Sequence, residues 1–227
     1  MTRFFRQLRT LVWKEFLVEL RARETAVAGV VFAVLVLVVF SFAFDLRVET
    51  AAQVAPGVLW VTVTFAGVLA LGRAFTRERD RRTLEGLLLA PMDRAVLYLA
   101  KVIAMLASML VVEVVAVPAA IGLFNLVIDL PLLVLSLVLG TIGLAGVGVL
   151  FSAIAAHTRA REVLLPLLLF PIQVPVILAT VKSTAAAIYV PGVDPPEPGQ
   201  WLGLLVAFDA IFLALSVVLF EFAIEED

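Results

Sequence analysis

The sequence predicts an all-α, polytopic membrane protein with six transmembrane helices in one membrane domain. Hydrophobic residues make up 63% of its 227 residues and charged residues only 16%, and the mean hydropathy is +1.12. Several apolar runs reach about 20 residues, the length that a helix needs to cross roughly 30 Å of hydrocarbon. These runs are unbroken, whereas strands of a membrane β-barrel alternate over about 10 residues. We therefore expect an N-terminal segment, residues 1–25, followed by one helical membrane domain, residues 26–227.

The N-terminal segment has the pattern of an amphipathic helix. At about 100° per residue, the basic and polar side chains of residues 3–24 gather on one side and the Phe, Leu and Val side chains on the other. Such a basic amphipathic helix is expected to lie in the headgroup region of the membrane. Glu15 and Glu19 fall on its apolar side. There they either reach the interface or pair with an arginine, or they contact a partner subunit.

Six apolar stretches then follow in order. The first is longer than the 7–15 residues of a signal-peptide core and follows a long segment that contains acids, so we interpret it as a transmembrane helix. Pro118 is expected to end or kink the third helix, and residues 119–128 either extend it outward or form a short surface piece. Small residues spaced by four predict close helix packing in the fourth stretch, and three prolines predict a kinked helix in the fifth. The expected spans are about 26–44, 54–75, 95–117, 131–156, 163–181 and 201–220.

Basic residues are concentrated on one side of this predicted topology. All 17 Lys and Arg residues except Arg47 and Lys182 lie before the first span, in or beside the connection after the second, or after the fourth. This bias predicts a cytoplasmic N-terminus, and six spans return the C-terminus to the same side. Trp13 is then expected at the inner membrane surface, and Trp60 and Trp201 are expected toward the outer one, where amphipathic rings are favoured.

The densest charged stretch, residues 77–94, lies between the second and third spans. Leu84, Leu87 and Leu88 have helical spacing within it. We predict a short cytoplasmic helix parallel to the membrane, ended by Pro91, whose apolar face docks into the groove of a partner. The alternative is a solvated basic loop that only fixes the topology. A purely solvated loop would be expected to avoid three consecutive leucines, so the docking helix explains the pattern better.

The sequence contains no motif for nucleotide binding or for catalysis. It lacks the G-x-x-x-x-G-K-[ST] pattern that cradles ATP phosphates, and it has no cysteine. The single histidine, His157, excludes a multi-histidine metal or haem site within this chain. His157 lies beside Arg159 and Arg161 in a short connection, where it is either a solvated or headgroup residue, or a ligand or proton relay.

Two acidic residues lie inside apolar spans, Glu113 in the third and Asp209 in the sixth. Ionisable groups at membrane depth usually face the interior of a helix bundle and mark a pathway. Structural pairing, or a position near the membrane surface, is the alternative for each. Together with Trp60, these two acids are the candidate pathway residues.

The chain resembles the haem exporter protein B family, the CcmB permeases of cytochrome c maturation, over nearly its whole length. The resemblance rests on Ala55-Pro56-Gly57-Val58-Leu59-Trp60, on Leu69-Ala70-Leu71 with Arg73, and on Thr83-Leu84-Glu85 with Leu87-Leu88-Leu89. Lys101 and the segment Phe170-Pro171-Ile172-Gln173-Val174-Pro175 also fit. One departure is Arg82, which stands where the family pattern has glycine before Thr-Leu-Glu.

This resemblance implies a multi-pass permease subunit of an ABC transporter complex in the bacterial inner membrane. The chain would bind no cofactor itself, ATP would bind at a separate CcmA-like ATPase, and haem would be a candidate cargo. Implied partners also include a CcmC-like haem-handling membrane protein, a CcmE-like periplasmic haem chaperone and a second copy of the chain. The expected ATPase-coupling residues are Thr83, Leu84, Glu85, Leu87, Leu88 and Pro91.

Two other functions fit the same architecture. One is an ABC-2-like exporter permease for a lipid or another amphiphile. The other is a stand-alone carrier or structural membrane subunit that needs no ATPase. None of these three functions is that of an enzyme.

Overall fold

The protein is almost entirely helical. The computed structural model describes residues 2–21, 23–43, 48–75, 92–156, 158 and 160–225. The predicted coupling helix, with residues 76–91, and His157 lie outside the described residues. The elements in chain order are α1 (Thr2–Arg21), α2 (Arg23–Ala43), α3 (Val48–Leu71), α6 (Arg94–Phe124), β1 (Val127–Ile128), α7 (Leu130–Ala156), α8 (Arg161–Ala186), β2 (Ile188–Tyr189) and α9 (Pro198–Glu225).

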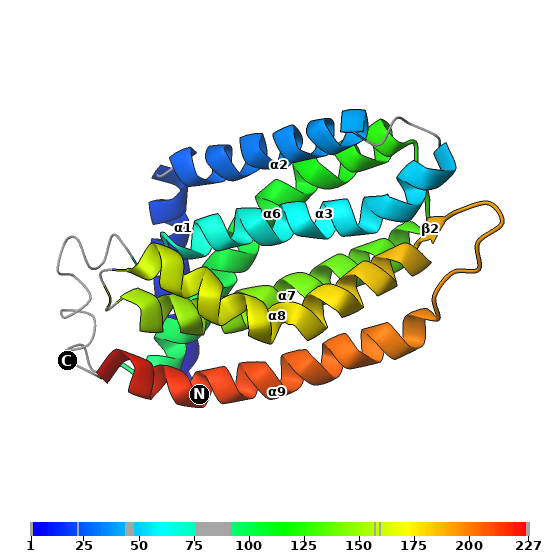
Figure 1. Cartoon of the computed structure of the whole chain (residues 1–227). Coiled ribbons are helices and arrows are strands. Elements are labelled where there is room, and N and C mark those ends of the chain that lie inside the picture. The colour runs from blue at the N-terminus through cyan, green and yellow to red at the C-terminus, as the bar shows by residue number, and fades with distance from the viewer. Residues whose placement is uncertain are drawn as a thin grey trace.

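Six of the described helices, α2, α3, α6, α7, α8 and α9, are long and apolar enough to cross a membrane. This confirms the prediction of an all-α, polytopic membrane protein. The six helices run side by side, and both chain ends lie at the same end of the bundle (Figure 1). We call this end the terminal end and the other, where the β-strands lie, the strand end.

The helices pack in successive rows. α2 contacts α3 and α6, α3 contacts α7 and α8, and α6 contacts α7. α9 contacts α6, α7 and α8, so that α2 and α9 form opposite edges (Figure 1). The central helix is α7, with 67% of its apolar window buried against 22% for α2 and for α9. The buried core therefore surrounds α7.

The glycines of α7 bring the neighbouring helices close. A Cβ atom at Gly140 would overlap Trp60 of α3 and Thr180 of α8, and one at Gly148 would overlap Leu71 of α3. The Ser152 hydroxyl donates a hydrogen bond of 2.6 Å to the carbonyl oxygen of Leu71. The close packing predicted from the small residues of this helix is confirmed at these positions.

Helix α6 continues through Pro118 to Phe124, so Pro118 does not end the helix, and the alternative that it kinks the helix stays a prediction. Asn125 ends it instead, in the left-handed conformation at φ 48°, and its N–H bonds to the Ile121 carbonyl oxygen. Asparagine tolerates this conformation better than most residues, whereas a proline within a membrane helix is tolerated when its surroundings satisfy the freed carbonyl. Residues 119–124 therefore extend α6, which confirms for these residues the predicted alternative that the helix continues outward.

Two short strands join the connections at the strand end. β1 follows α6, β2 follows α8, and they pair antiparallel, with Val127 opposite Tyr189 and Ile128 opposite Ile188. The Asp129 N–H adds a bond of 2.7 Å to the Ala187 carbonyl oxygen. The sequence analysis did not predict these strands, because two residues are too few to show an alternating pattern.

Helix α1 lies across the terminal end of the bundle and packs against α6 and α2 (Figure 1). Part of its apolar side faces α6, while Phe5 and Trp13 remain exposed. Exposed aromatic side chains on a basic helix at the end of a membrane bundle fit the predicted interfacial position.

Candidate functional site

A buried lysine connects three elements at the terminal end of the bundle. Lys101 of α6 donates to Oε2 of Glu15 on α1 at 3.1 Å and to the carbonyl oxygen of Ala74 at 2.9 Å. Its Nζ atom also lies 5.0 Å from the centre of the Phe75 ring. Lys101 and Glu15 are only 4% and 6% exposed. We call Lys101, Glu15, Ala74 and Phe75 the Lys101 cluster.

The Lys101 cluster compensates its own buried charges. A buried ion pair offsets the cost of desolvation only when further hydrogen bonds and favourable contacts surround it. Here the carbonyl oxygen of Ala74 and the face of the Phe75 ring provide such contacts for the ammonium group. Lys14 provides a second cation for Glu15, at 2.7 Å from its Oε1 atom.

This cluster lies at the base of the predicted coupling segment. Ala74 and Phe75 are the last described residues before it, and α6 begins at its last residue, Arg94. The Asp93 carboxylate caps α6 by accepting the Ala95 N–H at 2.9 Å. Both ends of the segment are therefore held by packed, hydrogen-bonded structure.

The structure places Glu15 inside the chain, where it pairs with two lysines. The side chain of Glu19 lies outside the described residues. So do all of the expected ATPase-coupling residues: Thr83, Leu84, Glu85, Leu87, Leu88 and Pro91. Their roles remain predictions.

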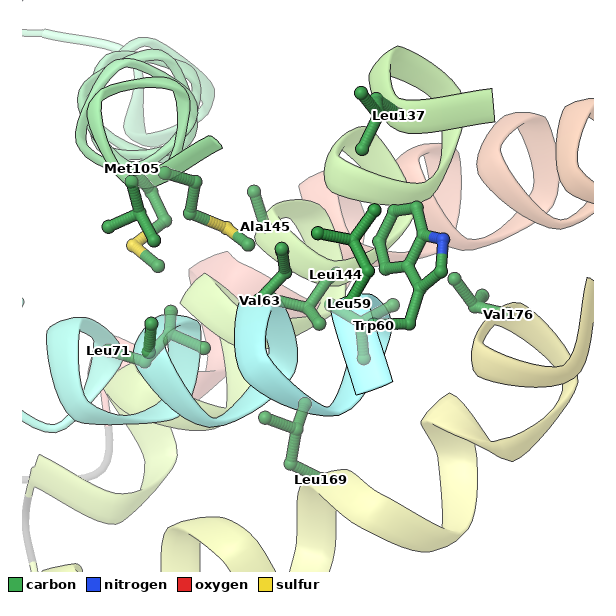
Figure 2. Close-up of a cluster of buried hydrophobic side chains, with 14 of the residues drawn as sticks. Leu59, Trp60, Val63, Leu71, Met105, Leu137, Leu144, Ala145, Leu169 and Val176 are labelled. Carbon is green, nitrogen blue, oxygen red and sulfur yellow. The ribbon is translucent and has the colours of Figure 1, made fainter. Parts of the chain in front are cut away.

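Trp60 is fully buried in the bundle. Its predicted position toward the outer membrane surface stays a prediction. Its ring packs among α3, α7 and α8, near Leu144 and Val176 (Figure 2). The indole Nε1–H donates to the Thr184 hydroxyl at 2.8 Å, which satisfies within the protein the polar group that would otherwise favour the interface.

The three candidate pathway residues all contact one turn of α7. Trp60 lies at Gly140, Glu113 of α6 accepts a hydrogen bond from the Thr141 hydroxyl, and Asp209 of α9 lies at Gly143. We call residues 140–143 the polar turn of α7. No local pattern indicates that residues from three helices meet there, because their separations along the chain are large.

Gln173 of α8 is a fourth residue at the polar turn, which the sequence analysis did not assign to a site. Its Nε2 atom donates to the carbonyl oxygens of Gly143 at 3.2 Å and Leu144 at 3.4 Å. Gln173 is completely buried. An isolated amide within an apolar, proline-rich span was the signal that could have indicated it.

The two acidic residues at the polar turn differ in their hydrogen bonds. The Glu113 carboxylate has Thr141 as its donor. Neither carboxylate oxygen of Asp209 has a hydrogen-bond partner in the described part of the chain, and nor does Oε1 of Gln173. Asp209 is 6% exposed, so bulk water does not solvate it fully.

The fold and these buried polar sites define a multi-pass helical membrane protein whose polar groups gather inside the bundle. The family described as CcmB protein matches residues 6–226, and the chain belongs to this family. "Heme exporter protein B" of Bradyrhizobium diazoefficiens is 27% identical over 213 residues, which cover 92% of this chain and 93% of the relative.

Two further relatives carry the same name. "Heme exporter protein B" of Pseudomonas aeruginosa is 31% identical over 199 residues, covering 86% of this chain and 83% of the relative. The protein of that name in Escherichia coli K12 is 28% identical over 211 residues, covering 80% and 85%. The similarity therefore extends over most of the membrane domain.

Proposed function

We propose that this chain is the permease subunit of an ABC-type complex that acts in cytochrome c maturation. The complex would export haem, deliver it to a periplasmic haem chaperone, or release the loaded chaperone. The observation that carries the proposal is membership of the CcmB family over residues 6–226, together with relatives named "Heme exporter protein B". The six apolar helices support a role within the membrane.

In this proposal a separate, CcmA-like ATPase supplies the energy. The chain has no P-loop of its own, and its leucine-rich segment 77–94 offers an apolar surface for docking. The Lys101 cluster supports this coupling role, because it links the end of α3 to α6 and α1 beside the segment. A displacement of the segment would then move α1, α3 and α6 together.

The other partners follow from the same family resemblance. They are a CcmC-like haem-handling membrane protein, a CcmE-like haem chaperone and a second copy of this chain. The single histidine follows α7, so the membrane spans offer haem apolar and aromatic surface and no imidazole ligand. Haem would be cargo here and not a resident cofactor.

We further propose a bacterial inner-membrane location with both termini in the cytoplasm. The basic residues cluster in the connections that this orientation assigns to the cytoplasm. The chain has no cysteine, so a single introduced cysteine reports on its own position. Cysteines placed at residues 92 and 193 should react with a membrane-impermeant thiol reagent from opposite sides; labelling from the same side would exclude this topology.

The decisive experiment deletes the gene and measures covalent haem attachment to periplasmic c-type cytochromes. We expect attachment to be lost and to return with the wild-type gene on a plasmid. Normal attachment in the deletion strain would exclude the proposed function. In that case an altered export of lipid or another amphiphile would favour the ABC-2-like exporter, which remains the alternative because it uses the same architecture.

The docking of the ATPase needs its own test. Leu87→Asp and Leu88→Asp place charge on the apolar side of the predicted coupling helix, and we expect them to abolish co-purification of the ATPase. The matched control is Asp80→Ala, which lies within the same charged stretch and adds no charge to the apolar side. Unaltered co-purification and ATPase activity in both leucine variants would exclude docking at this segment.

A further inference from the structure

The junction of α7, α8 and α9 contains hydrogen-bond acceptors that lack donors. Gln173 of α8 donates to the carbonyl oxygen of Gly143 on α7, and Oδ1 of Asp209 on α9 occupies the space where a side chain at Gly143 would begin. Within the described residues, Oδ1 and Oδ2 of Asp209 and Oε1 of Gln173 have no partner. Both side chains are more than nine-tenths buried, since Asp209 is 6% exposed and Gln173 is 0% exposed.

Gly143 makes the approach of the carboxylate possible. Oδ1 of Asp209 would lie 2.6 Å from a Cβ atom at this position, and Val176 of α8 would lie 3.3 Å from the same atom. All three helices therefore meet at one glycine. A larger residue would displace the carboxylate or separate the helices.

The charged groups of the neighbouring helices are committed elsewhere or lie far along the chain. α7 has no titratable residue, and the described side chain of Lys182 on α8 lies nine residues beyond Gln173, about 13 Å along the helix. On α6, Lys101 binds Glu15, Glu113 is bonded to Thr141, and Tyr98 donates to the Gly146 carbonyl oxygen at 3.0 Å. Arg94 lies at the first turn of α6.

The unpartnered atoms specify the chemistry of a ligand. All three are acceptors, so they attract a positive charge or a hydrogen-bond donor and repel an anion. One carboxylate supplies a single negative charge, which matches a monovalent ion. Carboxylate and amide oxygens are also the ligand atoms that hard cations prefer.

We propose that Asp209 and Gln173 bind a monovalent cation at the junction of α7, α8 and α9. The cation is either an alkali metal ion or a proton, and in both cases its positive charge compensates the buried carboxylate. Its binding stabilises the contact of α9 with the centre of the bundle. This inference concerns the folded chain itself and does not depend on the proposed transport function.

The test measures thermal unfolding of the purified full-length chain in lipid nanodiscs. Midpoints are compared in sodium, potassium and choline chloride at equal ionic strength, and in choline from mildly acidic to mildly alkaline pH. A filled site should raise the midpoint by about 2–4 °C, because a ligand that binds only the folded state stabilises it. An increase with sodium or potassium identifies an alkali ion, and an increase only with acid identifies a proton.

Variants assign the effect to this site. Asp209→Asn should abolish the response, whereas Glu113→Gln, which changes the other buried acid of the polar turn, should retain it. Gly143→Ala displaces the Asp209 carboxylate without removing it and should weaken the response, which provides a second variant if Asp209→Asn does not fold. A wild-type midpoint that responds to neither ion nor pH overturns the proposal, as does a response of equal size in Asp209→Asn.

Discussion

The Lys101 cluster and the Asp209–Gln173 site are both buried and polar, but they differ in what compensates their charge. Lys101 has a carboxylate, a carbonyl oxygen and an aromatic ring around its ammonium group. Asp209 has no donor among the described residues. The chain itself therefore supplies all the partners of the Lys101 cluster, which holds elements together. The Asp209–Gln173 site lacks a donor or cation, and a ligand that supplies one would complete it.

The largest expected effect comes from breaking the completed site. Lys101→Met removes the buried cation beside Glu15 and should lower the free energy of unfolding by about 3 kcal/mol, because the buried carboxylate then keeps only the more exposed Lys14. Chemical denaturation of the purified chain measures this loss. The double variant with Glu15→Gln should recover most of it, since no charge then remains buried. Equal losses in the single and double variants would show that the ion pair is not the cause.

Lys14→Met is the matched control for this experiment. Lys14 also pairs with Glu15, but its side chain is 36% exposed. Exposed ion pairs contribute less than about 1 kcal/mol, so this variant should unfold almost as the wild type does. A loss as large as that of Lys101→Met would place the stabilising interaction at Lys14 instead.

A smaller effect is expected from crowding the polar turn. Gly140→Ala introduces a Cβ atom that overlaps Trp60 and Thr180, and overpacking of this kind costs about 1–3 kcal/mol. Gly122→Ala in α6 is the control, because nothing lies within 4 Å of its added Cβ atom. Thermal unfolding should show a lower midpoint only for Gly140→Ala, and equal midpoints would contradict the packing described around α7.

The hydrogen bond of Trp60 should contribute still less. A double-mutant cycle with Trp60→Phe and Thr184→Val isolates the Nε1–H to hydroxyl bond from the packing of the ring. We expect a coupling energy of about 1 kcal/mol from unfolding measurements. Strict additivity of the two single variants would mean that the bond adds nothing to stability.

The smallest effect is expected at the uncompensated acid. In choline chloride at neutral pH, Asp209→Asn should cause no loss of unfolding free energy and should raise it if the carboxylate is ionised, because the variant removes a buried charge that has no donor among the described residues. Thr141→Val is the contrast, because it leaves Glu113 without its donor and should cost about 1–3 kcal/mol. The reverse order would mean that Asp209 is compensated and Glu113 is not.

Hydropathy and charge predicted much of the fold, because both are local properties of the chain. Each membrane span is a sum over about 20 neighbouring residues, and the helices lie where that sum is high. The ends were less accurate: α3 begins at Val48 and α8 continues to Ala186, several residues beyond the expected spans. Residues near a helix end add little to such a sum.

The contacts of the buried sites could not be predicted in the same way. Glu15 and Lys101 are 86 residues apart in sequence, and Trp60 and Thr184 are 124 apart. Helical periodicity placed Glu15 on the apolar side of its helix but could not name its partner. Topology and residue type predict that Trp60 lies toward the outer membrane surface, but they could not indicate its contacts with the space beside Gly140 and with the hydroxyl of Thr184.

The β1–β2 pairing also determines which relative movements the helices can make. Backbone hydrogen bonds hold the α6–α7 connection to the α8–α9 connection at the strand end, opposite the end that α1 crosses (Figure 1). A displacement that begins at the Lys101 cluster would therefore leave the paired strands together. It would separate α6 and α7 from α8 and α9 mainly at the terminal end, as a rotation about the strands. If the proposed coupling to an ATPase is right, a disulfide between Val127→Cys and Tyr189→Cys should leave the coupled activity intact, and a loss of that activity on oxidation would show that the strands must separate.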